Sequence, residues 1–181
     1  SYDATLTAPV FDQKGILFGF LLVRAHWMDL GAKDPGYVLD STDMHQEGLI
    51  FPGTKLVKNR IVDHELIELI RFNSRMPDVV IGDFNAMVAS IRTGERRTHE
   101  VLSKFGRELL DQSIAQILDS AERATARSLM NLPQGSWSAV DYIDDDGIGD
   151  DPIEMRVTVT IKDGKFIVDF IGSAGTQKGP V

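Results

Sequence analysis

The spacing of apolar residues changes along the chain, and this change constrains the fold more than any other feature. Up to residue 62 apolar residues form short runs bounded by turns, from 63 to 132 they recur at helical spacing, and from 133 to 181 they largely alternate. A period near 3.6 indicates helices, and a period of two indicates strands with one buried face. The sequence therefore predicts an α+β fold: mixed, mainly antiparallel sheet segments, a central run of helices and a C-terminal β-meander.

The first segment predicts a β-hairpin followed by a long loop. Two apolar runs, TLTAPVF and ILFGFLLVRA, flank the turn-forming residues 12–15. The second run is continuously apolar, which indicates a strand covered on both faces and a hairpin that belongs to a larger sheet. Residues 29–53 are rich in Gly, Pro, Asp, Ser and Thr and show no period. A loop of this length is often functional, so it is a candidate wall of a site.

The central segment predicts several helices. Asp63 is a candidate N-cap for HELIELIRF, and Pro77 is expected to end that pattern. Two further helices are predicted over 83–91 and 95–105. The longest helix is predicted over 108–130, where apolar residues continue at helical spacing up to the region before a proline.

The last segment predicts an antiparallel meander. SWSAVDYI, IEMRVTVTI and KFIVDFIG have strand composition, and Asp163-Gly164 is a tight-turn signal between the last two. Asp144, Asp145 and Asp146 resemble a calcium loop only superficially, because the alternating carboxylates and the closing Glu of that loop are missing. We interpret this acidic run as a solvated hairpin tip.

Composition excludes several classes of function. The net charge of −8 disfavours nucleic-acid and anionic-membrane partners, whose binding depends on Lys and Arg. The longest apolar run, 16–23, is too short to span a membrane, and no signal segment opens the chain, so the cytoplasm is the expected compartment. No nucleotide-binding P-loop is present. The chain lacks an initiating Met and begins in a strand-like pattern, which suggests a piece of a longer protein.

A cluster of candidate metal ligands lies around the end of the predicted hairpin. The chain has no cysteine, so any metal must bind His, Asp or Glu. His26 and Asp29 form H-x-x-D where the strand gives way to the loop, and His with carboxylate suits Zn, Mn or Fe(II). The alternative is a histidine that hydrogen-bonds a nearby carboxylate. Because a stable site needs at least three protein groups, Asp3, His45 and Glu47 are the nearest further candidates.

Each further candidate also has a structural alternative. Asp3 could lie on the outward face of a strand, Glu47 could pair with Lys55 or Lys58, and His45 could be solvated. The sequence places His64 and His99 on helices among polar neighbours, which is typical of surface histidines. Three residues bracket Pro77 and are interpreted as helix caps and an ion pair: Asn73, Arg75 and Asp83.

An ordered series of segments resembles the hydantoinase B/oxoprolinase family over nearly the whole chain. In chain order they are PVFDQKG, RAHWMDLGA, DMHQEGLIFP, NSRMPDVVIGDFNA, TGERR, LPQGSW, DDDG and VDFIGSAGTQKGPV. The resemblance implies that residues 1–181 are part of one larger subunit, with 1–62 as hairpin and metal-site loop, 63–132 helical and 133–181 the meander. It also attributes metal binding and catalysis to His26 and Asp29, and it matches Asp3 to an acidic family position.

The resemblance further implies a hetero-oligomeric, two-component enzyme. Its partner would be a hydantoinase A-type subunit with an actin-like fold that binds ATP, and the pair would open cyclic amides such as hydantoins or 5-oxoproline. An alternative is a subunit of an ATP-dependent acetone- or acetophenone-type carboxylase, and another is a scaffold module without catalysis. Family members commonly have Asp-Val-Gly-Gly where this chain has Asp29-Leu30-Gly31-Ala32. Alanine disfavours positive φ, so we expect the loop after Asp29 to follow a different course.

Overall fold

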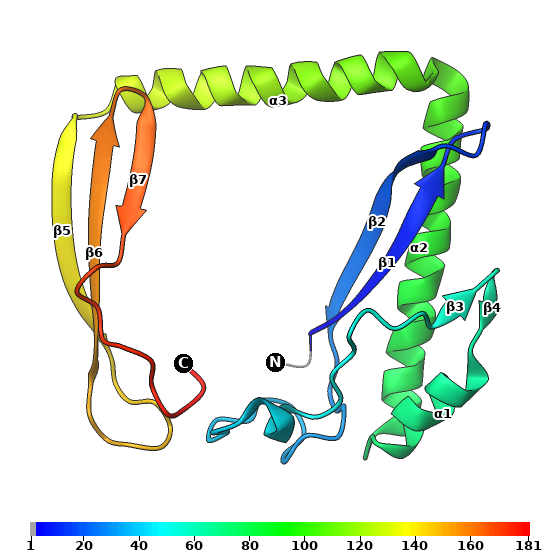
Figure 1. The fold of residues 1–181 in the computed structure, drawn as a ribbon, viewed down its shortest axis with the longest axis horizontal. Helices are drawn as coiled ribbons and strands as arrows, with labels where there is room; N and C mark the ends of the chain where they lie inside the picture. The colour runs from blue at the N-terminus through cyan, green and yellow to red at the C-terminus, as the bar shows by residue number, and fades with distance from the viewer. Residues whose placement is uncertain (1–2) are drawn as a thin grey trace. The chain divides into compact units, whose positions relative to one another are not determined.

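A computed structural model describes residues 3–181 and divides the chain into two compact units, the first ending at Lys104 and the second beginning at Phe105. Each unit combines helices with antiparallel strands, so the predicted α+β class is confirmed (Figure 1). No helix within residues 3–181 has the length and hydropathy needed to cross a membrane. The elements are, in chain order, β1 (Asp3–Phe11), β2 (Leu17–His26), η1 (Met44–Glu47), β3 (Val57–Lys58), β4 (Ile61–Val62), α1 (His64–Phe72), α2 (Pro77–Phe105), α3 (Arg107–Met130), β5 (Gly135–Ile143), β6 (Ile153–Lys162) and β7 (Lys165–Asp169).

The predicted first hairpin is present as β1 and β2. The strands pair antiparallel from Asp3 opposite His26 to Phe11 opposite Leu17. The Asp12 carboxylate closes the turn by accepting the backbone N–H groups of Lys14 and Ile16, each at 2.9 Å. One face of this hairpin packs on the core that α2 helps to form, and Figure 1 shows both strands running beside α2.

The other face of the hairpin is apolar and exposed in the part of the chain that the structure describes. Phe20 is 59% exposed and Leu22 is 65% exposed, although both lie in the continuously apolar run of β2. Their pleat neighbours point to the opposite face, as the alternating burial of β2 shows. The sheet that β1 and β2 form has two strands among residues 3–181, so its extension by other segments stays a prediction.

The core of the first unit joins the hairpin end, the long loop and both helices. Trp27 is 1% exposed, and its indole N–H donates to Met87 Sδ at 3.2 Å. Asp63 caps α1 as predicted, accepting the Leu66 N–H at 3.3 Å. The buried members of this core are Trp27, Leu30, Ala32, Val38, Ile70, Val80, Phe84 and Met87.

The predicted helices over 83–91 and 95–105 are wrong as separate elements, because one helix, α2, runs through both. Pro77 begins this helix instead of merely ending the preceding pattern, and proline is favoured at a first helical position because it needs no N–H partner there. At 29 residues α2 is also longer than the 24 residues of α3, which was predicted to be the longest. The predicted gap between residues 91 and 95 is continuous helix, and a Cβ at Gly94 in this stretch would lie close to Leu21 of β2.

The two interior glycines of α2 allow a matched stability test. A Cβ at Gly94 would lie 3.1 Å from Leu21 Cδ1, whereas a Cβ at Gly82 would meet nothing within 4 Å. Gly82→Ala should therefore stabilise the first unit by the full helix-propensity gain of about 1 kcal/mol, and Gly94→Ala should gain less. Urea denaturation followed by Trp27 fluorescence, in a Trp137→Phe background, measures both. An equal gain in stability for the two variants would show that the packing of Leu21 tolerates a Cβ at position 94.

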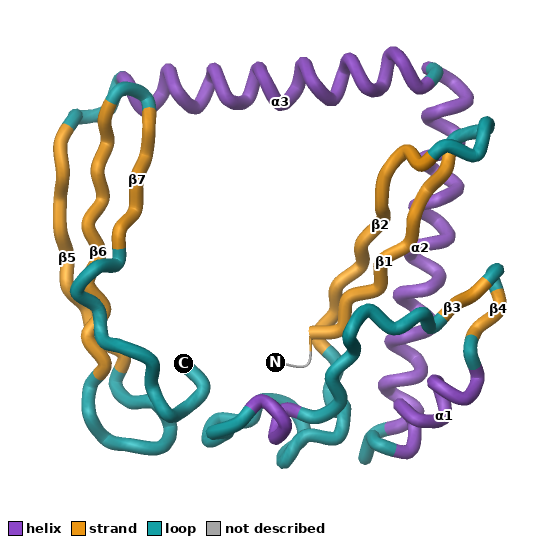
Figure 2. The backbone as a smooth tube through the Cα atoms, viewed as in Figure 1, coloured by secondary structure: helices purple, strands orange, loops and turns teal. Residues whose placement is uncertain are grey.

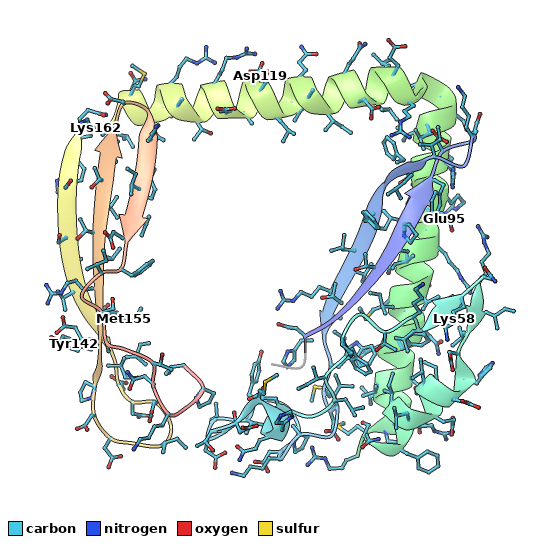
Figure 3. The ribbon with its side chains drawn as sticks, in the orientation of Figure 1. Lys58, Glu95, Asp119, Tyr142, Met155 and Lys162 are labelled. Atoms are coloured by element: carbon cyan, nitrogen blue, oxygen red, sulfur yellow. The ribbon has the colours of Figure 1, made fainter. Side chains whose placement is uncertain are left out.

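The predicted long loop joins β2 to β3 and carries the short helix η1 (Figure 2). A small hairpin not predicted from the sequence follows it, with β3 and β4 joined by Asn59 and Arg60 at φ 50° and 66°. Arg60 donates to Glu95 of α2 at 3.0 Å, and Figure 3 labels Glu95 together with Lys58 of the same hairpin. Lys58 pairs with Asp63 at 3.0 Å.

The second unit contains α3 and the predicted C-terminal meander. Strands β5, β6 and β7 pair antiparallel in chain order, with Tyr142 and Met155 on adjacent strands in Figure 3. Asp163 and Gly164, at φ 51° and 72°, form the predicted tight turn between β6 and β7. Most apolar side chains of the meander are exposed, whereas Ile153 and Ile161 are buried.

The acidic loop between β5 and β6 is an exposed hairpin tip, as predicted, and one of its carboxylates also binds the C-terminal segment. The Asp146 carboxylate accepts backbone N–H groups from both its own loop and the C-terminal segment: Ile148 at 2.9 Å, Gly149 at 2.7 Å, Lys178 at 3.2 Å and Gly179 at 3.0 Å. These hydrogen bonds lower the pKa of Asp146 to about 2, and the bond from Gly149 has the largest effect. The prediction missed this role because the C-terminal donors lie more than thirty residues away in sequence.

Candidate functional site

The end of the first hairpin brings together two of the predicted ligands. Asp3 lies directly opposite His26 in the β1–β2 register. The His26 Nδ1 and Asp3 Oδ1 atoms are 3.4 Å apart, and both side chains are partly exposed. The other carboxylate oxygen of Asp3 accepts from the Arg24 guanidinium. A histidine and a carboxylate therefore meet at a solvent-accessible strand end, where Arg24 restrains the carboxylate.

Tyr37 covers one face of the His26 imidazole. The two rings are stacked with centroids 4.6 Å apart and planes at 20°. Tyr37 reaches this position because the loop turns back, with the Gly36 N–H donating to the Met28 carbonyl at 2.8 Å. Tyr37 itself stays accessible to solvent, with 71% of its surface exposed. The sequence contained no signal for this contact, because stacking of this kind depends on the course of the loop.

Asp29 is fully buried and has a different partner. Its side chain is 0% exposed, and Arg75 holds both carboxylate oxygens, with Nη2 to Oδ1 at 2.7 Å and Nε to Oδ2 at 2.9 Å. The backbone N–H groups of Arg75 and Gly31 also donate to the carboxylate, at 2.5 and 3.0 Å. These hydrogen bonds lower the pKa of Asp29 to about 2, and those from the Arg75 side chain have the largest effect. Burial of the carboxylate opposes this shift.

Arg75 also binds the chain just beyond Asp29. Its Nη2 donates to the Ala32 carbonyl at 2.9 Å, and its Nη1 donates to the Lys33 carbonyl at 3.2 Å. We refer to Arg75 with Asp29, Ala32 and Lys33 as the Arg75 clamp. Asn73 caps the C-terminus of α1 as interpreted. The interpreted ion pair among the residues around Pro77 is wrong, because Arg75 pairs with Asp29 of the distant loop, whereas Asp83 lies within α2.

The loop after Asp29 has its own backbone restraints. Gly31 takes the positive φ, 81°, while Ala32 is buried in the core. Lys33 N–H donates to the Gln46 carbonyl at 2.9 Å, and Leu49 N–H donates to the Leu30 carbonyl at 2.9 Å. Ala32 therefore has two roles in this loop: its carbonyl belongs to the Arg75 clamp, and its side chain fills a core position.

His45 and Glu47 lie in η1 with partners of their own. The Asp43 carboxylate caps η1 by accepting the His45 backbone N–H at 2.8 Å. Glu47 Oε1 accepts from the hydroxyl of buried Ser41 at 2.6 Å. Within residues 3–181 no three His, Asp or Glu side chains form a group that could hold a metal ion. The structure thus brings Asp3 and His26 together and joins neither Asp29 nor the η1 residues to them.

The geometry allows a direct comparison with a metal site. Two adjacent ligands at about 2.1 Å from a tetrahedral ion lie roughly 3.4 Å apart. The Nδ1–Oδ1 separation of Asp3 and His26 is 3.4 Å, and their donor set suits Zn, Mn or Fe. Asp29 does not fit, because donors already occupy both of its oxygens. Asp3 and His26 are therefore the only two of the predicted ligands that the structure brings together among residues 3–181.

The proteins similar to this chain are considerably longer than it is. The B component assigned to a D-/L-hydantoinase of Pseudomonas sp. (strain NS671) is 30% identical over 178 residues, covering 95% of this chain and 30% of that protein. The beta chain of the caprolactamase of Pseudomonas jessenii is 29% identical over 161 residues, covering 88% of this chain and 28% of that protein. The chain thus spans about a third or less of these relatives.

Solved structures share the fold. The ATP-dependent caprolactamase from Pseudomonas jessenii superimposes with a TM-score of 0.80 at 25% identity, covering 92% of this chain and 29% of that one. A nucleotide-free acetone carboxylase superimposes with a TM-score of 0.83 at 19% identity, covering 95% of this chain and 24% of that one. The family model for hydantoinase B/oxoprolinase matches residues 1–181, and this chain belongs to that family.

Proposed function

We propose that this chain is part of the metal-containing subunit of an ATP-dependent cyclic amide hydrolase of the hydantoinase or 5-oxoprolinase type. The family match supports the proposal, as do relatives named for hydantoinase and for an ATP-dependent caprolactamase. The observation that carries it is the opposed pair Asp3 and His26 at the end of the first hairpin. A hydantoinase A-type subunit with an actin-like fold would bind ATP as the partner in a hetero-oligomer.

In this proposal His26 and Asp3 hold the metal, and Asp29 lies outside its coordination shell. His45 and Glu47 remain candidates for a further ligand, together with segments of the larger subunit. A bound Zn, Mn or Fe ion would polarise the carbonyl of the cyclic amide. Arg24 would orient the Asp3 carboxylate, and Tyr37 would restrict the rotation of the His26 ring.

Elemental analysis of the full-length subunit, purified with its ATPase partner, tests the metal assignment. We expect stoichiometric metal in the wild type and a loss of affinity greater than about tenfold in His26→Gln and in Asp3→Asn. His64→Gln is the matched control, because His64 is an exposed residue on α1. A wild-type subunit without metal would contradict the assignment, and so would retention of metal by both variants.

Phosphate release identifies the reaction. We expect ATP hydrolysis by the complex to rise with a hydantoin, 5-oxoproline or caprolactam. Stimulation only by a ketone with bicarbonate would instead favour a carboxylase, a protein class that shares this fold. Activity that is equal in wild type and His26→Gln would favour a scaffold role for this segment.

A further inference from the structure

Arg75 does not contact His26, but its position allows it to influence the orientation of the His26 ring. Its side chain comes from the junction between α1 and α2, where Ile70 and Val80 are 1% and 0% exposed. The junction is therefore anchored in the core of the first unit. From this fixed point the guanidinium reaches the loop that follows β2 and binds Asp29, Ala32 and Lys33.

The clamped residues lie inside the turn that returns the chain to His26. The hydrogen bond between Gly36 N–H and the Met28 carbonyl, at 2.8 Å, closes a segment that contains residues 29–33. Tyr37 follows this closure directly and stacks on the imidazole. Since Tyr37 is 71% exposed, burial of its own side chain contributes little to holding it there. The position of the ring thus depends on the backbone of the clamped loop.

We propose that Arg75 is a positioning residue for His26: through the Arg75 clamp it fixes residues 28–37, and so keeps Tyr37 stacked on the imidazole. The consequence for metal binding rests on the proposed function, whereas the ring geometry does not. Only arginine has the planar fork that can bind both carboxylate oxygens and two carbonyls together. Lysine would keep the charge beside Asp29 and lose this geometry.

Histidine NMR of the full-length subunit tests the ring geometry. With ¹³C-labelled histidine, His26→Gln assigns the His26 signal, and Tyr37→Leu shows the shift that follows loss of the stacked ring. We expect Arg75→Lys to move the His26 signal in the same direction as Tyr37→Leu does. Arg71→Gln is the matched control, because Arg71 lies on α1 with Glu68 as its ion-pair partner, and it should leave the signal unchanged.

Metal affinity provides the second readout. Arg75→Lys should weaken binding of the resident metal by about 10- to 100-fold, as loss of an outer-shell partner does, while Arg71→Gln should not. A folded Arg75→Lys variant with the wild-type His26 signal would overturn the proposal. So would a His26 signal unaffected by Tyr37→Leu. Failure of both Arg75→Lys and Arg75→Gln to fold would assign Arg75 a purely structural role instead. A wild type without metal but with the expected NMR shifts would reject the proposed metal and leave the positioning role standing.

Discussion

Replacing Arg75 by methionine should lower the free energy of unfolding of the first unit by about 3 kcal/mol, because it leaves the fully buried Asp29 carboxylate without its counter-ion. Removing one partner of a buried ion pair costs about 3–5 kcal/mol. We expect the lower end of that range, since the Arg75 side chain is 46% exposed and water can reach its place. Urea denaturation followed by Trp27 fluorescence, in a Trp137→Phe background, gives the value.

A double-mutant cycle separates the ion pair from other effects of the substitution. The Asp29→Asn, Arg75→Met double variant keeps an oxygen for the Gly31 N–H and removes the unpaired charge. It should therefore be more stable than Arg75→Met alone, with a coupling energy of at least about 1 kcal/mol between the two residues. If the losses in stability of the two single variants add up, the ion pair does not contribute. The destabilisation by Arg75→Met would then come from the lost hydrogen bonds to the Ala32 and Lys33 carbonyls.

The same pair predicts a pH dependence with a definite sign. The folded state lowers the pKa of Asp29 from 3.8 to about 2, so the ionised carboxylate favours folding. This stabilisation, about 2 kcal/mol, is complete above pH 5 and is lost as the pH falls from about 4 to about 2. The stability difference between wild type and Asp29→Asn should shrink over that range. A difference independent of pH would assign the effect to packing.

Gly48→Ala should cost at least about 3 kcal/mol, since two penalties act at this position. Gly48 has φ 93°, a conformation that residues with a side chain rarely adopt. A Cβ there would also lie 2.5 Å from the Leu30 carbonyl oxygen and 2.9 Å from the Ala32 nitrogen. Both are backbone atoms of the loop that Arg75 clamps, so they cannot move aside without disturbing it.

Gly36→Ala is the matched control for this prediction. Gly36 lies in the same loop at φ 82°, but a Cβ there would meet nothing within 4 Å. Its replacement should carry only the backbone penalty of about 1–2 kcal/mol. Urea denaturation of the two variants compares them directly. If they lose the same stability, the close approach of Gly48 to Leu30 and Ala32 does not contribute.

Local sequence patterns predicted most of the secondary structure. The turn at residues 12–15, the cap at Asp63 and the turn at Asp163-Gly164 each depend on a few consecutive residues. The same patterns failed between residues 91 and 95, where the predicted gap between two helices is continuous helix. Leu21 of β2 packs against Gly94 in this stretch, and such a neighbour cannot be inferred from the helix itself.

The candidate site was predicted as a set of named residues, without the geometry that joins or separates them. Asp3 and His26 meet because the hairpin register places them opposite each other, and a shift of one residue would separate them. Sequence proximity favoured Asp29 as the companion of His26, yet its buried carboxylate pairs with a guanidinium 46 residues away. Tyr37 reaches His26 only through the folded loop.

The sequence by itself determined the α+β class, the hairpin, the meander and the family, because each depends on local period, turn chemistry or an ordered series of segments. Only the tertiary structure decided which carboxylate stands beside His26 and which is held by Arg75. The reason is physical: a buried charge must be paired by whichever donor the packing of distant segments brings within reach, and local spacing contains no information about that packing.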